Sequence, residues 1–113
     1  MAEIICYDSR GNEITRFYQW DKNQSITVKG VPVSPIPVFQ FANRKRCTSI
    51  TVTPTVKGTQ MTAMVPNELF EEAEPLFAYI YREEATGAGR TLGVIEIPVR
   101  PRRKPSDYIA DAN

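Results

Sequence analysis

The chain has 113 residues, of which 42% are hydrophobic and 24% charged, so its composition suits one globular domain and argues against wholesale disorder. Lys and Arg number 14 against 13 Asp and Glu, and a net charge of +1 is too balanced for a protein that coats phosphate. Histidine is absent, which removes the commonest general base and the commonest metal ligand. No apolar run approaches the ~20 residues of a membrane span, and the N-terminus lacks the pattern of a signal peptide, so we expect synthesis in a cytoplasm and no membrane contact.

Short stretches rich in alternating apolar and β-branched residues recur along the chain, with turn residues between them. They predict strands within residues 3–7, 14–20, 24–30, 38–42, 47–53, 60–65, 76–83 and 90–99. The segment 31–37 is too rich in proline for a central strand, because each proline removes a ladder donor, so we expect it to cross from one sheet to the other. The strand 76–83 is apolar on both faces, which indicates a central position in its sheet. These faces are formed by Phe77, Tyr79 and Tyr81 and by Leu76, Ala78 and Ile80.

Only residues 65–75 break the strand pattern. Asn67 suits an N-cap, acidic residues follow it in the first turn, and Pro75 can stop a helix, so we expect one or two helical turns. The sequence therefore predicts an all-β fold, an antiparallel β-sandwich, immunoglobulin-like, of seven to eight strands with one short helical turn near residues 67–73. A partly open barrel is the alternative. We expect residues 1–99 to form the sandwich domain and residues 100–113 to leave it as an extended tail rich in proline and arginine.

Residues that could carry chemistry do not assemble into a catalytic pattern. The glycines of "GAGRTLG" (87–93) lack the spacing of a dinucleotide fingerprint and lie between two strands, so they indicate a hairpin tip. The acids between residues 68 and 84 fit the exposed start of a helix better than the carboxylate pair of a hydrolase. Cys6 and Cys47 fit neither a disulfide framework nor a zinc motif and are interpreted as buried thiols. We expect no catalytic residues, no cofactor and no metal.

An aromatic cluster stands at the junction of a strand and a loop. Phe17, Tyr18 and Trp20 could together form a platform on which a sugar or a base stacks. Alternatively, Trp20 plugs the end of the sandwich core, as large aromatic residues commonly do in this fold class. We favour the second interpretation and keep the three residues as candidates for ligand stacking.

The C-terminal run "RPRRKP" (100–105) concentrates positive charge in a stretch stiffened by proline. Phosphate contacts with nucleic acid are one interpretation. No aromatic residue interleaves with the cations, however, and the prolines force an extended backbone, which favours a strap lying on the acidic surface of a neighbouring protein. The candidate partner-binding residues are Arg100, Arg102, Arg103, Lys104 and Tyr108.

Three stretches, "YQWD" (18–21), "PVFQF" (37–41) and "IPVRPRRKPSDYI" (97–109), are the most specific parts of a resemblance that covers roughly residues 4–109. The chain resembles a small domain of minor structural proteins of phages and prophages of Gram-positive bacteria, similar to the N-terminal domain of siphophage upper baseplate proteins. The resemblance implies a non-enzymatic virion component, assembled in the host cytoplasm, that attaches to other virion proteins and forms a homo-oligomer, with a trimer as the natural guess. The alternatives are a carbohydrate-binding module that contacts the host surface and a capsid decoration protein.

Overall fold

The computed structural model describes residues 4–45 and 48–107. In these residues the regular structure is strand, apart from one short 3-10 helix. The strands and the helix are β1 (Ile5–Tyr7), β2 (Phe17–Tyr18), β3 (Ser25–Lys29), β4 (Val38–Ala42), β5 (Ile50–Val52), β6 (Thr55–Lys57), β7 (Gln60–Met64), η1 (Asn67–Phe70), β8 (Leu76–Glu83), β9 (Gly89–Ile97) and β10 (Val99–Arg100).

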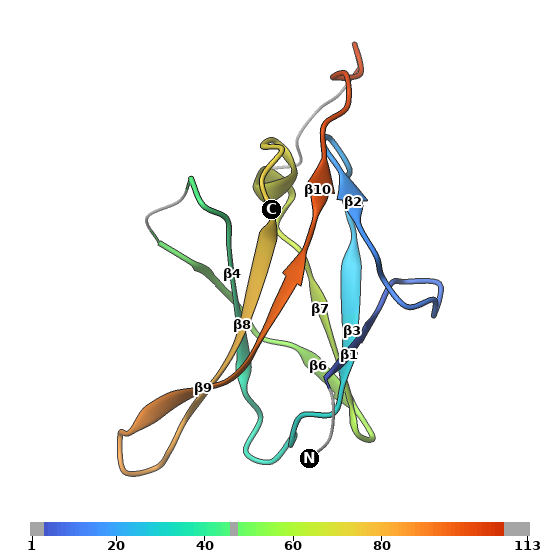
Figure 1. Cartoon of the computed structure of the whole chain (residues 1–113). Coiled ribbons are helices and arrows are strands. Elements are labelled where there is room, and N and C mark those ends of the chain that lie inside the picture. Colours follow the sequence, from blue (N-terminus) through green and yellow to red (C-terminus); the bar gives the residue numbers. More distant parts are fainter. Residues whose placement is uncertain (1–3, 46–47, 108–113) are drawn as a thin grey trace.

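Two antiparallel four-stranded sheets form a sandwich (Figure 1). The first sheet has the strand order β1-β3-β7-β6 and the second the order β5-β4-β8-β9. Residues 31–37 contain no strand and connect β3 of the first sheet to β4 of the second, as the prolines predict. The antiparallel sandwich is therefore confirmed, while its immunoglobulin-like outline stays a prediction.

The described residues form ten strands, more than the seven to eight expected, in part because two of them are only two residues long. These two, β2 and β10, pair with each other in parallel and lie at one end of the sandwich (Figure 1). The strand expected over residues 14–20 is reduced to β2, because a turn begins after Tyr18.

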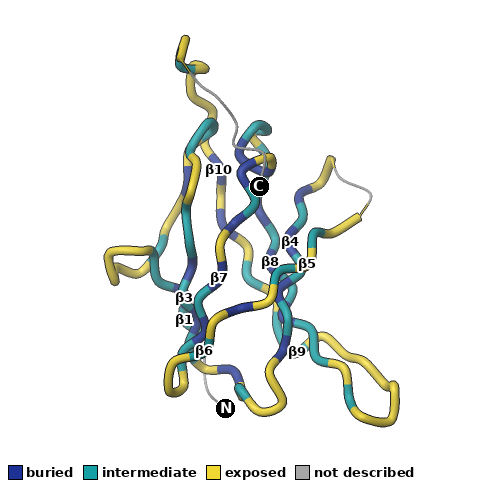
Figure 2. Tube along the Cα trace, turned by 180° about the vertical axis from the view of Figure 1, so that it is seen from behind, coloured by how far each residue is buried: buried dark blue, intermediate teal, exposed yellow. Residues whose placement is uncertain are grey.

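Strand alternation builds the core between the sheets. Every second residue of β3, β4, β7 and the first part of β8, up to Ile80, faces inward and is almost fully buried. These residues are Ile26, Val28, Phe39, Phe41, Met61, Ala63, Leu76, Ala78 and Ile80. Figure 2 shows the buried positions along the strands and the exposed ones in the loops. β8 lies between β4 and β9, so its predicted central position is confirmed.

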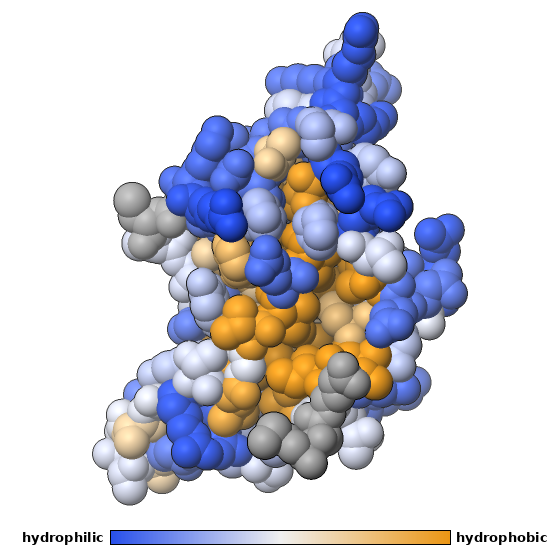
Figure 3. Space-filling view, in the orientation of Figure 1, coloured by the Kyte–Doolittle hydropathy of each residue, from blue (hydrophilic) through white to orange (hydrophobic). Residues whose placement is uncertain are grey.

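The two sheets also approach each other at their edges, where Ile4, the residue before β1, reaches β9. The side chain of Ile4 contacts Gly93 of β9 so closely that a Cβ there would collide with Ile4 Cδ1. Ile14, Leu92 and Ile95 are partly buried and also pack against the core. Figure 3 shows apolar residues gathered in the middle of this face, with hydrophilic residues around the β10 end.

The short helix η1 lies where the sequence predicts it but is shorter than residues 67–73. The prediction that Asn67 is its N-cap is wrong, because Asn67 is the first helical residue and Pro66 occupies the cap position. The Asn67 side chain instead accepts a hydrogen bond from the backbone N–H of Asn23 at 2.7 Å. Leu69 and Phe70 are buried and dock the helix on the core.

A candidate interaction site at the C-terminal strand

The C-terminal chain stays paired with the domain past residue 99, where the sequence places the start of the tail. The Phe17 N–H donates to the Pro98 carbonyl at 2.9 Å, and the Gln19 N–H donates to the Arg100 carbonyl at 2.8 Å. Val99 lies between these two bonds and is only 5% exposed. Arg100, which the sequence assigns to a free tail, is therefore part of strand β10, and the core extends to the residue before it.

Beyond β10 two further contacts hold the backbone of Arg102. Its N–H donates to Gln19 Oε1 at 3.2 Å, and its carbonyl accepts a hydrogen bond from the Trp20 indole Nε1 at 3.1 Å. The other end of the Gln19 side chain donates to the carbonyl of Glu71, just after η1, at 3.0 Å. Gln19 thus links the end of the helix to the C-terminal backbone, a role that nothing in the sequence indicates.

A tight turn after β2 presents the indole to Arg102. The carboxylate of Asp21 accepts the Tyr18 N–H at 3.0 Å, and the Trp20 N–H donates to the carbonyl of Phe70 at 2.8 Å. Trp20 has a φ of 68°, a left-handed conformation that is rare for bulky residues. These hydrogen bonds hold that conformation and direct the ring toward the C-terminal backbone.

We define residues Arg100–Lys104 as the cationic segment. Its four cationic residues are all exposed, and the ammonium of Lys104 lies 5.1 Å from the centroid of the Trp20 ring. Within the part of the chain that the structure describes, no ion pair engages the guanidinium groups of Arg100, Arg102 and Arg103. Tyr108, the remaining candidate for partner binding, lies outside the described residues. The backbone of the segment is therefore held by hydrogen bonds at Arg100 and Arg102, and the guanidinium groups of Arg100, Arg102 and Arg103 face solvent.

The aromatic cluster does not form a common stacking platform. Phe17 is 4% exposed and its ring packs edge-on against Phe70, with 4.9 Å between the ring centroids. Tyr18 points the other way and is 43% exposed, because neighbouring residues of a strand face opposite sides. Trp20 is half-buried beside the cationic segment and so does not plug the core. The prediction that Phe17 belongs to a stacking platform is therefore wrong. The prediction that Trp20 plugs the end of the core is wrong as well.

Other groups offer little reactive chemistry in the described part of the chain. Burial raises the pKa of the Cys6 thiol from 9.0 to about 12, so this thiol is protonated at neutral pH. Residues 4–45 and 48–107 contain no group of three or more Cys, Asp or Glu side chains placed to hold a metal ion. No helix in those ranges is long and apolar enough to cross a membrane. Cys47 lies outside the described residues.

Comparisons with known proteins leave the resemblance noted in the sequence as a prediction. No family model, no curated protein and no solved structure matches this chain.

Proposed function

We propose that the chain is a non-enzymatic structural subunit of a phage particle, which attaches to neighbouring virion proteins through the cationic segment. The observation that carries the proposal is the backbone of this segment, which is hydrogen-bonded up to Arg102 while its guanidinium groups stay exposed. The resemblance of residues 97–109 to phage structural proteins supports the assignment to a virion.

A cationic strand with a fixed backbone is well suited to binding a protein. Ordering one residue of a free chain costs about 1–2 kcal/mol, and the hydrogen bonds with Phe17 and Gln19 already offset this cost for residues 98–102 before a partner binds. Guanidinium groups bind carboxylates through two parallel hydrogen bonds, so the complementary surface is one rich in Asp and Glu. We therefore assign the partner surface an acidic character.

Charge reversal tests this proposal. We suggest changing Arg100, Arg102 and Arg103 to Glu and keeping Lys104, because Lys104 contacts the Trp20 ring. Supplied to cells that lack the native gene, this variant should be absent from purified particles, which should contain the unchanged chain when examined by immunogold labelling and mass spectrometry. The variant protein should keep its circular dichroism spectrum and melting temperature.

A matched control carries the same change in charge elsewhere on the surface. Arg10, Arg16 and Lys22 are exposed, and their triple change to Glu should leave incorporation intact. Incorporation of both variants, or of neither, would refute a specific role for the cationic segment. Absence of the unchanged chain from every particle would refute the virion assignment itself. The homo-oligomer is tested separately by light scattering, where a monomer at all concentrations would oppose it.

A further inference from the structure

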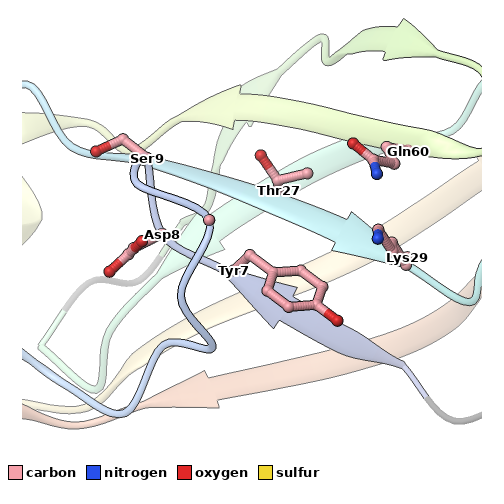
Figure 4. A pocket seen from close by; sticks show the side chains of 7 residues that line it. Tyr7, Asp8, Ser9, Thr27, Lys29 and Gln60 are labelled. Atoms are coloured by element: carbon pink, nitrogen blue, oxygen red, sulfur yellow. The ribbon is translucent and has the colours of Figure 1, made fainter.

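The outer face of the first sheet carries a polar hollow of about 270 Å³. Its walls come from three neighbouring strands and from the turn that follows β1 (Figure 4). The lining residues are Tyr7, Asp8, Ser9, Gly11, Thr27, Lys29 and Gln60. The cationic segment contributes no residue to this hollow.

Local hydrogen bonds fix the rim of the hollow. The Asp8 carboxylate oxygen Oδ1 accepts the N–H groups of Arg10 at 2.9 Å and of Asn12 at 3.0 Å, which closes the turn. Gly11 has a φ of 84°, a conformation that suits glycine, and it leaves the rim without a side chain at this point. The rim is thus formed before any ligand arrives.

The floor of the hollow is held by side-chain contacts across the strands. The hydroxyls of Thr27 and Thr62 share a hydrogen bond of 2.9 Å between β3 and β7. The ammonium of Lys29 lies 5.0 Å from the centroid of the Tyr7 ring, so the ring and the cation fix each other. Figure 4 shows Tyr7 of β1 close to Lys29 of β3, with Thr27 further along β3 and Gln60 on β7.

The lining has mixed polarity and no excess charge. Asp8 is its acid and Lys29 its cation, and the other polar side chains are hydroxyls and one amide, each of which both donates and accepts. A phosphate or sulfate ion would be repelled by the Asp8 carboxylate, and the hollow has only one ammonium, that of Lys29, to offset this repulsion. An apolar ligand would leave the polar side chains without hydrogen bonds. The ligand that matches this lining is neutral and rich in hydroxyls, which can pair with the carboxylate, the ammonium, the hydroxyls and the amide of the hollow.

We propose that this hollow binds one unit of a neutral saccharide. Its volume lies just below the roughly 300–1,000 Å³ of typical small-molecule sites, so it accommodates a single sugar ring better than an extended oligosaccharide. The hollow lies on the surface of a sheet, and few groups converge on it, so a dissociation constant of about 1–10 mM is expected for a free monosaccharide. This function is independent of the attachment proposed above.

Nuclear magnetic resonance titration of the whole chain tests the inference. The probes are the methyl glycosides of glucose and galactose, N-acetylglucosamine and inorganic phosphate. At least one sugar should shift the backbone amide resonances of Gly11, Lys29 and Gln60 in a saturable way, while phosphate should not. The substitutions Gln60→Ala, at the edge of the hollow, and Tyr7→Ala should each raise the dissociation constant for that sugar by roughly tenfold or more.

Tyr18→Ala is the matched control for the loss of a tyrosine, since Tyr18 is exposed on β2 and lies outside the hollow. It should leave the titration unchanged. If no sugar of the panel produces saturable shifts, or if phosphate binds more tightly than every sugar, the assignment is overturned. Equal affinities for the unchanged chain and Gln60→Ala would overturn it too, and this variant leaves the core intact because Gln60 is only half-buried.

Discussion

Replacing Gln19 with alanine should loosen the cationic segment and lower the stability of the whole domain. The side chain accepts the Arg102 N–H at 3.2 Å and donates to the Glu71 carbonyl at 3.0 Å, and alanine can do neither. A typical intramolecular hydrogen bond contributes about 0.5–1.5 kcal/mol net. Because Gln19 is half-buried and water can replace part of what is lost, we expect the free energy of unfolding to fall by about 1–2 kcal/mol.

This loss converts into a measurable change in melting temperature. The entropy of unfolding is about 2.1 cal/mol/K per residue, so a chain of 113 residues gives about 0.24 kcal/mol/K. The melting temperature followed by circular dichroism should therefore drop by about 4–8 °C. Hydrogen exchange at the Arg102 amide should also accelerate, because its acceptor is gone.

Gln24→Ala is the matched control, since Gln24 is also half-buried but its amide donates only to the nearby Lys22 carbonyl, at 3.1 Å. We expect its effect on the free energy of unfolding to stay within about 0.5 kcal/mol. Equal melting temperatures for the two variants, or unchanged exchange at Arg102 in Gln19→Ala, would show that Gln19 does not hold the C-terminal backbone.

Three further changes test the packing described above. Phe17→Ala should lower the free energy of unfolding, measured by urea titration, by about 3–5 kcal/mol because it empties a core site, whereas Tyr18→Ala on the opposite face should cost less than about 1 kcal/mol. The Cys6 thiol, with its pKa raised from 9.0 to about 12, binds a proton more tightly folded than unfolded, so its contribution to stability is present below pH 9 and lost as pH rises from 9 toward 12. Urea titrations over this pH range should therefore show a smaller decline in the free energy of unfolding for Cys6→Ala than for the unchanged chain. Equal declines would show that the Cys6 thiol does not cause the loss of stability. Gly93→Ala should lower the free energy of unfolding by less than about 1 kcal/mol, because the new Cβ meets only Ile4 Cδ1, the flexible end of a side chain that can move aside, and a larger fall in melting temperature would show that Ile4 is held rigidly against β9.

The parts of the fold that follow from local periodicity could be predicted from the sequence. The alternation in residues 76–83 identifies both faces of β8, and Leu76, Ala78 and Ile80 are indeed buried. Gly87 lies in the left-handed conformation at the tip of the hairpin between β8 and β9, as predicted, whereas Gly89 and Gly93 belong to β9. Both features depend on residues that are close together in the chain, so local sequence patterns predict them.

The pairing of β10 with β2 could not be predicted in this way, because it joins residues about 80 positions apart. The prolines around Val99 indicated an exit from the sheet, since proline has no N–H to donate. In the structure, however, Phe17 of β2 and Gln19 just after it supply the donors, and the carbonyls of Pro98 and Arg100 accept. Proline has no backbone N–H but keeps its backbone carbonyl. A strand whose residues at these positions only accept hydrogen bonds therefore tolerates proline.

The polar hollow depends on non-local geometry as well. Tyr7 lies opposite Thr27 in the register of β1 and β3, and Gln60 reaches the same face from β7. Each of these residues alone is an ordinary polar position of a strand that faces solvent on one side. Only the order β1-β3-β7 brings them together, and strand order is not encoded by alternation.

The same hydrogen bonds that close one end of the core also present the candidate binding residues, so stability and attachment are linked. Val99 completes the core next to Phe17, and the cations begin at the very next residue, Arg100. A partner that binds the segment only in its paired form must therefore stabilise the domain, by about 2.7 kcal/mol when present at 100 times its dissociation constant. By the same linkage, a change that unpairs β10 weakens attachment without touching a cation. The triple charge reversal and Gln19→Ala thus separate the two effects: the first removes attachment at unchanged stability, and the second lowers both.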